Sequence, residues 1–140
     1  MGSSEILPKR KTGKFYHGTS ADLLDKIRTE GLKCACEPGM GASKDYCEVY
    51  DSFGIVCLTT VPKQARFYSV VTAHFTRGLE RDALMVVEVE PGCLEPSMLK
   101  ARKSLTRKRP IEFDYKLNIP PECLKFYQWD EELRDFVRIL

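Results

Sequence analysis

The chain has 140 residues, of which 43% are hydrophobic, and this is enough apolar material for one packed core but not for two. Its unbroken apolar runs are far shorter than the roughly 20 residues that a bilayer-spanning helix needs, so the sequence excludes a transmembrane helix. The net charge of +2 is close to balance and does not by itself indicate a nucleic-acid-binding protein. We predict one domain over residues 14–140, preceded by a flexible basic arm at residues 1–13.

The domain begins with the pattern of a strand followed by a helix. Lys14–His17 has the composition of a short strand, and the hydroxyl of Thr19 or Ser20 can accept the first free amide protons of a helix. Apolar residues then recur at helical spacing up to Gly31, where a left-handed residue is expected to end the helix.

A long segment without periodicity separates this helix from the next strand. Residues 33–52 are rich in Gly, Cys, Pro, Asp and Ser, which predicts an irregular loop. Phe53–Thr60 is a short apolar run with β-branched residues and predicts a buried strand. Pro62 can then open a helix, because its missing N–H would have no partner there, and helical spacing continues to Phe75 before Gly78 closes the helix.

Strand patterns dominate the second half of the chain. Ala83–Glu90 and Ile111–Leu117 predict two strands, and the span Cys93–Pro110 between them has room for a turn or two of helix. An apolar and aromatic segment follows at Cys123–Trp129. Leu133–Leu140 alternates well enough for an edge strand, although a short helix is also compatible with it. This order of elements predicts an α+β fold with antiparallel pairing.

Six cysteines raise the questions of disulfides and of a metal site: Cys34, Cys36, Cys47, Cys57, Cys93 and Cys123. The first residues lack the apolar core of a secretory signal, so we expect a cytoplasmic protein with reduced thiols. The first three of these cysteines do not have the paired C-x-x-C spacing of a zinc site, and we predict no bound metal.

The first of three motifs places aromatic residues before a His-Gly-Thr sequence: Phe15-Tyr16-His17-Gly18-Thr19-Ser20, followed by Ile27 and Gly31-Leu32. It resembles the opening motif of the poly(ADP-ribose) polymerase-like transferases, which belong to the diphtheria-toxin-like branch of the ADP-ribosyltransferases. The resemblance implies that His17 binds the adenosine ribose of NAD. Because glycine has no Cβ, the backbone of Gly18 could approach the flat carboxamide of nicotinamide, with the Thr19 hydroxyl beside it.

The second motif is a strand followed by a helix that carries small residues and an aromatic ring. The segment Gly54-Ile55-Val56-Cys57-Leu58-Thr59-Thr60, with Ala65 and Tyr68, resembles it. The resemblance implies that Tyr68 stacks on nicotinamide, and a planar ring contributes on the order of 1 kcal/mol beyond its burial. Many family members carry a tyrosine on the strand itself, at about the place where Cys57 stands in this chain. This departure weakens the usual His-Tyr-Glu set and argues against polymerase-like activity.

The third motif is a glutamate at the start of a strand. Ile111-Glu112-Phe113, followed by Ile119 and by Leu124-Lys125-Phe126-Tyr127, resembles it. The resemblance implies that Glu112 bonds the 2′-hydroxyl of the nicotinamide ribose. A carboxylate there would stabilise positive charge at the anomeric carbon as nicotinamide leaves. Asp114 is the second candidate, because it shares a strand face with Glu112.

Taken together, the motifs imply an ADP-ribosyltransferase fold of split antiparallel β-sheets with a few flanking helices. They imply transfer of ADP-ribose, most simply one unit, from NAD to a macromolecule, with release of nicotinamide. In this fold the loop before the catalytic glutamate contacts the acceptor, and here six cations and no acid lie between Lys100 and Arg109. We therefore expect a protein or nucleic-acid acceptor, a monomer and no membrane partner. A toxin or effector acting in a host cytosol and a regulatory enzyme would share these features.

Two alternatives remain open. An RNA 2′-phosphotransferase also uses NAD and opens with His-Gly-Thr, but its later arginine and histidine-containing strand have no counterpart at Gly54-Ile55-Val56-Cys57. A catalytically silent module could keep the fold and bind a partner or an ADP-ribosyl ligand. Taken singly, His17, Tyr68 and Glu112 are each compatible with a purely structural role.

Overall fold

Seven antiparallel strands form one open sheet. The computed structural model describes residues 5–33, 55–102 and 109–139. Its strands, in chain order, are Phe15–Ser20 (β1), Val56–Thr59 (β2), Leu84–Val89 (β3), Leu99–Ala101 (β4), Glu112–Tyr115 (β5), Leu124–Asp130 (β6) and Asp135–Ile139 (β7). Neighbouring strands follow the order β4-β5-β2-β1-β3-β6-β7. The predicted α+β class with antiparallel pairing is therefore confirmed.

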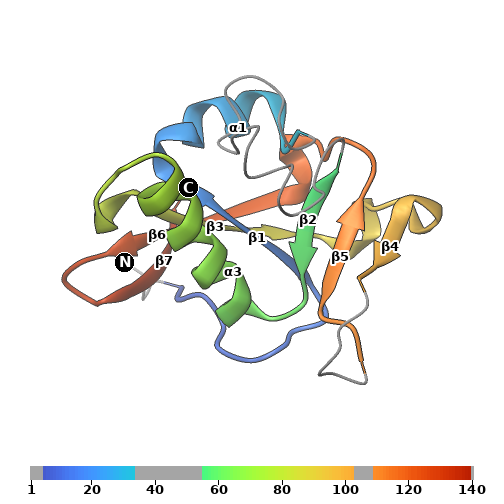
Figure 1. The fold of residues 1–140 in the computed structure, drawn as a ribbon, viewed down its shortest axis with the longest axis horizontal. Coiled ribbons are helices and arrows are strands. Elements are labelled where there is room, and N and C mark those ends of the chain that lie inside the picture. Colours follow the sequence, from blue (N-terminus) through green and yellow to red (C-terminus); the bar gives the residue numbers. More distant parts are fainter. Residues whose placement is uncertain (1–4, 34–54, 103–108, 140) are drawn as a thin grey trace.

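Two helices cover opposite faces of this sheet (Figure 1). Helix α1, Leu24–Glu30, follows a 3-10 turn at Ala21–Leu23, and helix α3, Pro62–Val70, continues into a π-helical turn at Val71–Thr76. Alternate residues of β3 enter two separate cores, one on the side of α1 and one on the side of α3. All six residues of β3 are consequently buried, which explains its nearly unbroken apolar sequence.

Helix α3 lies directly on β1. A Cβ added to Gly18 would lie 2.1 Å from the carbonyl oxygen of Ala65 and 2.5 Å from the amide nitrogen of Ser69, so only glycine permits this approach. The Ser69 hydroxyl donates to the C=O of Thr19 and accepts from the N–H of Met85, both at 2.8 Å. This hydroxyl joins β1 to β3 and fixes the position of α3 on both strands.

The start of the first helix differs from the sequence prediction. β1 continues to Ser20, because Thr19 and Ser20 pair with the first residues of β3. Ser20 makes no side-chain capping bond, and its hydroxyl donates to the carboxylate of Asp22 instead. The helix ends at Gly31 as predicted, with φ of 82°, but ψ of −172° is extended rather than left-handed helical.

The remaining elements agree with the sequence except at one place. The predicted strands around residues 53–60, 83–90 and 111–117 contain β2, β3 and β5, and the last two predicted segments contain β6 and the edge strand β7. In the span predicted to hold some helix, 3-10 turns form at Pro91–Cys93 and Pro96–Met98, but β4 follows them and was not predicted. Most of the predicted loop, residues 34–52, and the three cysteines in it lie outside the described residues.

Part of the predicted N-terminal arm pairs with the sheet. The N–H of Leu7 donates to Phe136 at 2.9 Å, the N–H of Arg138 donates to Glu5 at 2.7 Å, and Leu7 is only 1% exposed. Residues 5–7 therefore extend the sheet at β7. A polar backbone can lie at this edge because its hydrogen bonds are made to the strand.

Two of the cysteines form a disulfide. A disulfide joins Cys93, after β3, to Cys123, before β6, with the Cα atoms 6.1 Å apart. Reduced thiols were predicted, so the structure differs from the sequence expectation at this pair.

Within the described residues, no helix has the length and apolar character to cross a bilayer.

Candidate functional site

A carboxylate, a phenol and an amide form a hydrogen-bonded cluster between α3 and β5. The Tyr68 hydroxyl donates to Oε1 of Glu112. The side-chain amide of Gln64 donates to the same Oε1 at 3.1 Å and lies 3.4 Å from the Tyr68 hydroxyl. All three side chains are half-buried. The structure therefore brings together two of the predicted catalytic residues, Tyr68 and Glu112, and adds Gln64.

The local sequence explains why these side chains meet. Gln64 and Tyr68 are four residues apart, so they lie on the same face of α3. On β5, Phe113 and Tyr115 pack on the side of α1, and alternation along the strand turns Glu112 toward α3. Sequence reasoning missed Gln64, although its helical spacing from Tyr68 was a readable signal.

The cluster leaves one carboxylate oxygen of Glu112 for another partner. Both donors bond Oε1, and within the described residues no hydrogen bond is made to Oε2. A carboxylate oxygen can accept more than one hydrogen bond, so Oε2 can receive a hydroxyl from a ligand. The two donors hold the carboxylate in one orientation while it does so.

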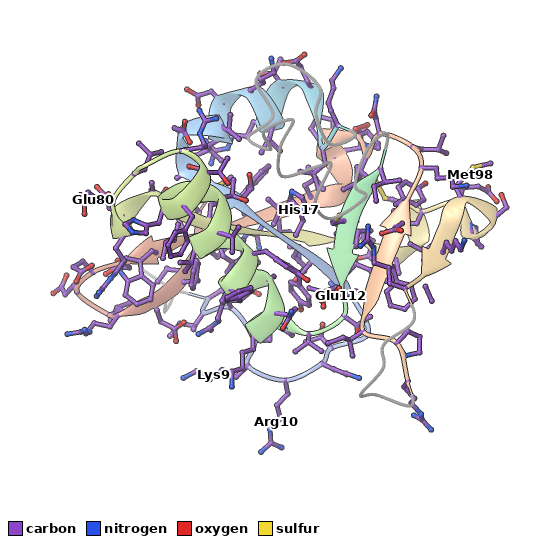
Figure 2. The ribbon with its side chains drawn as sticks, in the orientation of Figure 1. Lys9, Arg10, His17, Glu80, Met98 and Glu112 are labelled. Atoms are coloured by element: carbon purple, nitrogen blue, oxygen red, sulfur yellow. A yellow bond between two sulfur atoms is a disulfide. The ribbon has the colours of Figure 1, made fainter. Side chains whose placement is uncertain are left out.

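Beside this cluster the ladder between β1 and β2 is incomplete. The two strands share a single residue pair, Tyr16 with Thr59, whereas β1 and β3 pair along their whole length. We call the stretch beyond this pair, where Gly18 of β1 and Cys57 of β2 are no longer paired, the β1–β2 seam. Figure 2 shows Glu112 at the start of β5, beside the first turn of α3, and His17 farther along β1.

His17 bridges the seam through its ring. Its Nδ1 lies 2.8 Å from the carbonyl oxygen of Cys57. A carbonyl can only accept, so Nδ1 carries the proton and Nε2 of the neutral ring is an acceptor. Burial lowers the pKa of His17, although the bond to Cys57 opposes this shift, so the ring is neutral near pH 7. His17 can thus accept a hydroxyl group of a ligand at Nε2.

The backbone of Gly18 faces the same seam. The N–H of Thr60 donates to Ile111 at 2.9 Å, so by alternation the backbone groups of Cys57 and Thr59 point toward β1. Thr59 pairs with Tyr16, and therefore the N–H and C=O of Gly18, two residues farther, point toward β2 where pairing has ended. A flat amide could bond both groups.

The predicted residues of β1 do not all approach the cluster from the same side. By alternation His17 and Thr19 share the strand face of Phe15, which packs in the core beneath α1, whereas Tyr68 and Glu112 approach from α3. Thr19 is 2% exposed, and its predicted contact with the nicotinamide carboxamide beside Gly18 stays a prediction. His17 reaches the seam because its ring extends toward β2.

The other predicted features are placed only in part. Asp114, the second candidate carboxylate, is neutralised by the guanidinium of Arg102, which makes Glu112 the better candidate. Cys57, at the position of the family's strand tyrosine, pairs with Asp114 across β2 and β5. Of the cationic loop Lys100 to Arg109, residues 103–108 lie outside the described residues.

Comparison with known proteins adds no identification. No protein-family model matches this sequence, and a search of curated proteins gives no match. The assignment of a function therefore depends on the motifs and on the geometry around Glu112.

Proposed function

We propose that this chain is an NAD-dependent ADP-ribosyltransferase of the diphtheria-toxin-like, poly(ADP-ribose) polymerase-like branch. It transfers one ADP-ribose unit to a macromolecular acceptor and releases nicotinamide. The observation that carries the proposal is the bond from Tyr68 to Glu112 beside the β1–β2 seam. The single residue pair between β1 and β2 is also compatible with the split-sheet form of this fold.

The groups at the seam fit the parts of NAD. The N–H and C=O of Gly18 match a carboxamide, which has one acceptor and one donor group. The ring of Tyr68 supplies a flat apolar surface for nicotinamide. Oε2 of Glu112 and Nε2 of His17 are two acceptors that could each bond a ribose hydroxyl. Each assignment uses a different group, so the residues do not compete.

The proposed reaction exchanges one bond at the anomeric carbon for another. The bond from this carbon to nicotinamide breaks, and nicotinamide leaves with the electron pair. A nucleophilic atom of the acceptor then bonds to the carbon and loses its proton. Glu112 stabilises the positive charge that develops on the sugar, and Tyr68 and Gln64 hold its carboxylate for this purpose.

The test is turnover of labelled NAD by the purified protein, followed as nicotinamide release and as label transferred to protein or nucleic acid. Glu112→Gln keeps the shape of the side chain but removes its charge. We expect this substitution to lower kcat by about 10²- to 10³-fold with little change in NAD affinity, because the charge acts mainly in the transition state.

Asp114→Asn is the matched control. It removes a carboxylate from the same face of β5, but one that is paired with Arg102, so we expect activity within a few-fold of the parent. Full activity in Glu112→Gln would refute the assignment of this residue. NAD binding without turnover in the parent protein would instead support a silent module, and removal of phosphate from a 2′-phosphorylated RNA would support the phosphotransferase.

A further inference from the structure

Exposed cations from three separate segments lie near the first turns of α3. The segments are the N-terminal arm, the first turn of α3 and the residues before β5. We call these cations the basic edge: Lys9, Arg10, Lys11, Lys63 and Arg109. Figure 2 shows Lys9 and Arg10 projecting below the first turn of α3.

Hydrogen bonds connect the three segments that carry the basic edge. The N–H of Thr60 donates to the carbonyl of Ile111 at 2.9 Å. Lys63 follows Thr60 by a few residues and Arg109 comes shortly before Ile111, so both cations lie near this bond. On α3, the Arg66 guanidinium donates to the carbonyl of Leu7 at 3.3 Å, which joins the arm to the helix just before Lys9.

The charge of the basic edge is largely uncompensated. Lys9 lies 3.7 Å from Asp135, but Asp135 is also bonded by Arg66 at 2.8 Å. Among the described residues, no ion pair involves Arg10, Lys11, Lys63 or Arg109. The four cations of the basic edge that make no ion pair in the described part of the chain produce a positive field that attracts a polyanion.

An exposed aromatic ring accompanies these cations. Phe67 is 57% exposed and lies one helical turn beyond Lys63 on α3. The cationic loop itself contains no aromatic residue, so sequence reasoning found no stacking platform there. In the fold, α3 supplies the ring. Cations that contact phosphates, together with a ring that stacks on a base, are the combination that binds single-stranded nucleic acid.

We propose that the basic edge and Phe67 bind single-stranded nucleic acid through phosphate contacts and base stacking. A purely acidic polypeptide such as poly-glutamate would use the cations but has no ring to stack on the exposed phenyl group. The binding does not require NAD turnover. That the bound strand is also the acceptor is a consequence that rests on the proposed function, because Lys63 and Arg109 lie near the start of β5, where Glu112 stands.

The test is a binding titration without NAD, using fluorescent single-stranded RNA and DNA of about 20 nucleotides and poly-glutamate of similar charge. Binding of either nucleic acid at lower concentration than poly-glutamate supports the proposal, and the two oligonucleotides distinguish RNA from DNA. We expect log affinity to fall linearly with log salt concentration, with a slope of about −0.7 for each phosphate contact. Because no NAD is present, failure of the proposed enzyme activity would not affect this result.

Charge reversals locate the contact. We expect Arg10→Glu and Lys63→Glu each to weaken binding at low salt and to reduce the steepness of the salt dependence by about 0.7. Lys116→Glu is the matched control, because Lys116 is exposed but follows the opposite end of β5. An equal loss in all three variants would indicate a general charge effect and would overturn the assigned surface.

Removal of the ring separates stacking from charge. We expect Phe67→Ala to weaken oligonucleotide binding by on the order of 5- to 100-fold and to leave the salt dependence unchanged. Phe75→Ala removes a ring that is 74% exposed at the far end of the same helical segment, and it should bind as the parent does. Poly-glutamate that binds as tightly as either nucleic acid, or Phe67→Ala that binds normally, would overturn the proposal. Thermal unfolding of each variant verifies that it is folded.

Discussion

The two halves of the sheet are built differently. β1, β3, β6 and β7 pair along nearly their whole lengths, and β3 is buried on both faces. β4, β5 and β2 have three or four residues each and join the rest through one residue pair, Tyr16 with Thr59. The first half is a scaffold, and the second half holds Glu112 at its junction with the first.

The difference shows where a site can form in an antiparallel sheet. Complete ladders use every backbone donor and acceptor, so they leave nothing for a ligand. Where the pairing of β2 with β1 ends, the backbone of Gly18 and the ring of His17 face the β1–β2 seam, and α3 brings Tyr68 to the neighbouring Glu112. The candidate site therefore lies where the two halves of the sheet meet. Substitutions there can test the stability of the scaffold and the proposed NAD turnover separately.

The largest effect on stability is expected for Gly18→Ala. The new Cβ would meet the Ala65 carbonyl and the Ser69 amide at distances that no real Cβ adopts, so α3 must move away from β1. We expect a loss of about 1–3 kcal/mol in the free energy of unfolding, measured by denaturant titration.

Gly92→Ala is the control for this substitution. Nothing lies within 4 Å of the Cβ position at Gly92, so its stability should be close to that of the parent. Equal stability of Gly18→Ala and Gly92→Ala would show that α3 does not depend on close contact with β1. The comparison therefore tests whether the packing of α3 on β1 requires glycine at position 18.

The elements with a strong periodic signal could be predicted from the sequence. β3 is apolar throughout because both its faces are covered, and α3 has a proline at its start and helical spacing behind it. β4 was missed because three residues carry no periodicity of their own, and its position depends on pairing with β5. The end of β1 was missed because Thr19 and Ser20 read as helix caps, and their pairing with β3 is not local.

The sequence predicted some residues of the candidate site but not how they are arranged. The motifs named Tyr68 and Glu112, which are 44 residues apart and share a hydrogen bond. They did not name Gln64, because its role depends on β5 lying beside α3. The motifs also placed Thr19 at the site, and the alternation of β1 puts it on the same strand face as His17. Motifs identify residues, but the order of strands in the sheet decides which of them meet.

The next largest effect is expected on kcat, when the side chain that orients Glu112 is replaced. Gln64→Met keeps the length of the side chain and suits a helix, but it cannot donate to Oε1. We expect kcat for NAD turnover to fall by about 10-fold, equivalent to about 1.4 kcal/mol, with an unchanged KM for NAD.

Gln128→Met provides the matched control, because the amide of Gln128 donates to the carbonyl of Asp82 at 3.1 Å, in the scaffold half. It should lose little stability and no activity. A fall in both kcat and thermal stability in Gln64→Met would indicate a structural role for Gln64, and unchanged kinetics would remove it from the site.

The smallest expected effect is the pH dependence that His17 adds to stability. Burial lowers its pKa in the folded protein below the ordinary histidine value of 6.5, so the unfolded chain binds a proton more readily. The stabilising contribution of the neutral ring is complete above pH 6.5 and is lost as the pH falls toward the lowered pKa. One group can account for at most about 1.4 kcal/mol per pH unit in this window.

The chain contains two histidines, which makes a paired measurement possible. His17→Gln replaces the ring with an amide that cannot titrate but can donate to Cys57, and His74→Gln makes the same change at an exposed position. We expect the loss of unfolding free energy between pH 7 and about pH 5.5 to be smaller in His17→Gln than in the parent, and unchanged in His74→Gln. If both variants lost as much stability as the parent, the ring of His17 would not be held neutral at the junction, and its Nε2 would not be an acceptor for a ribose hydroxyl over this pH range.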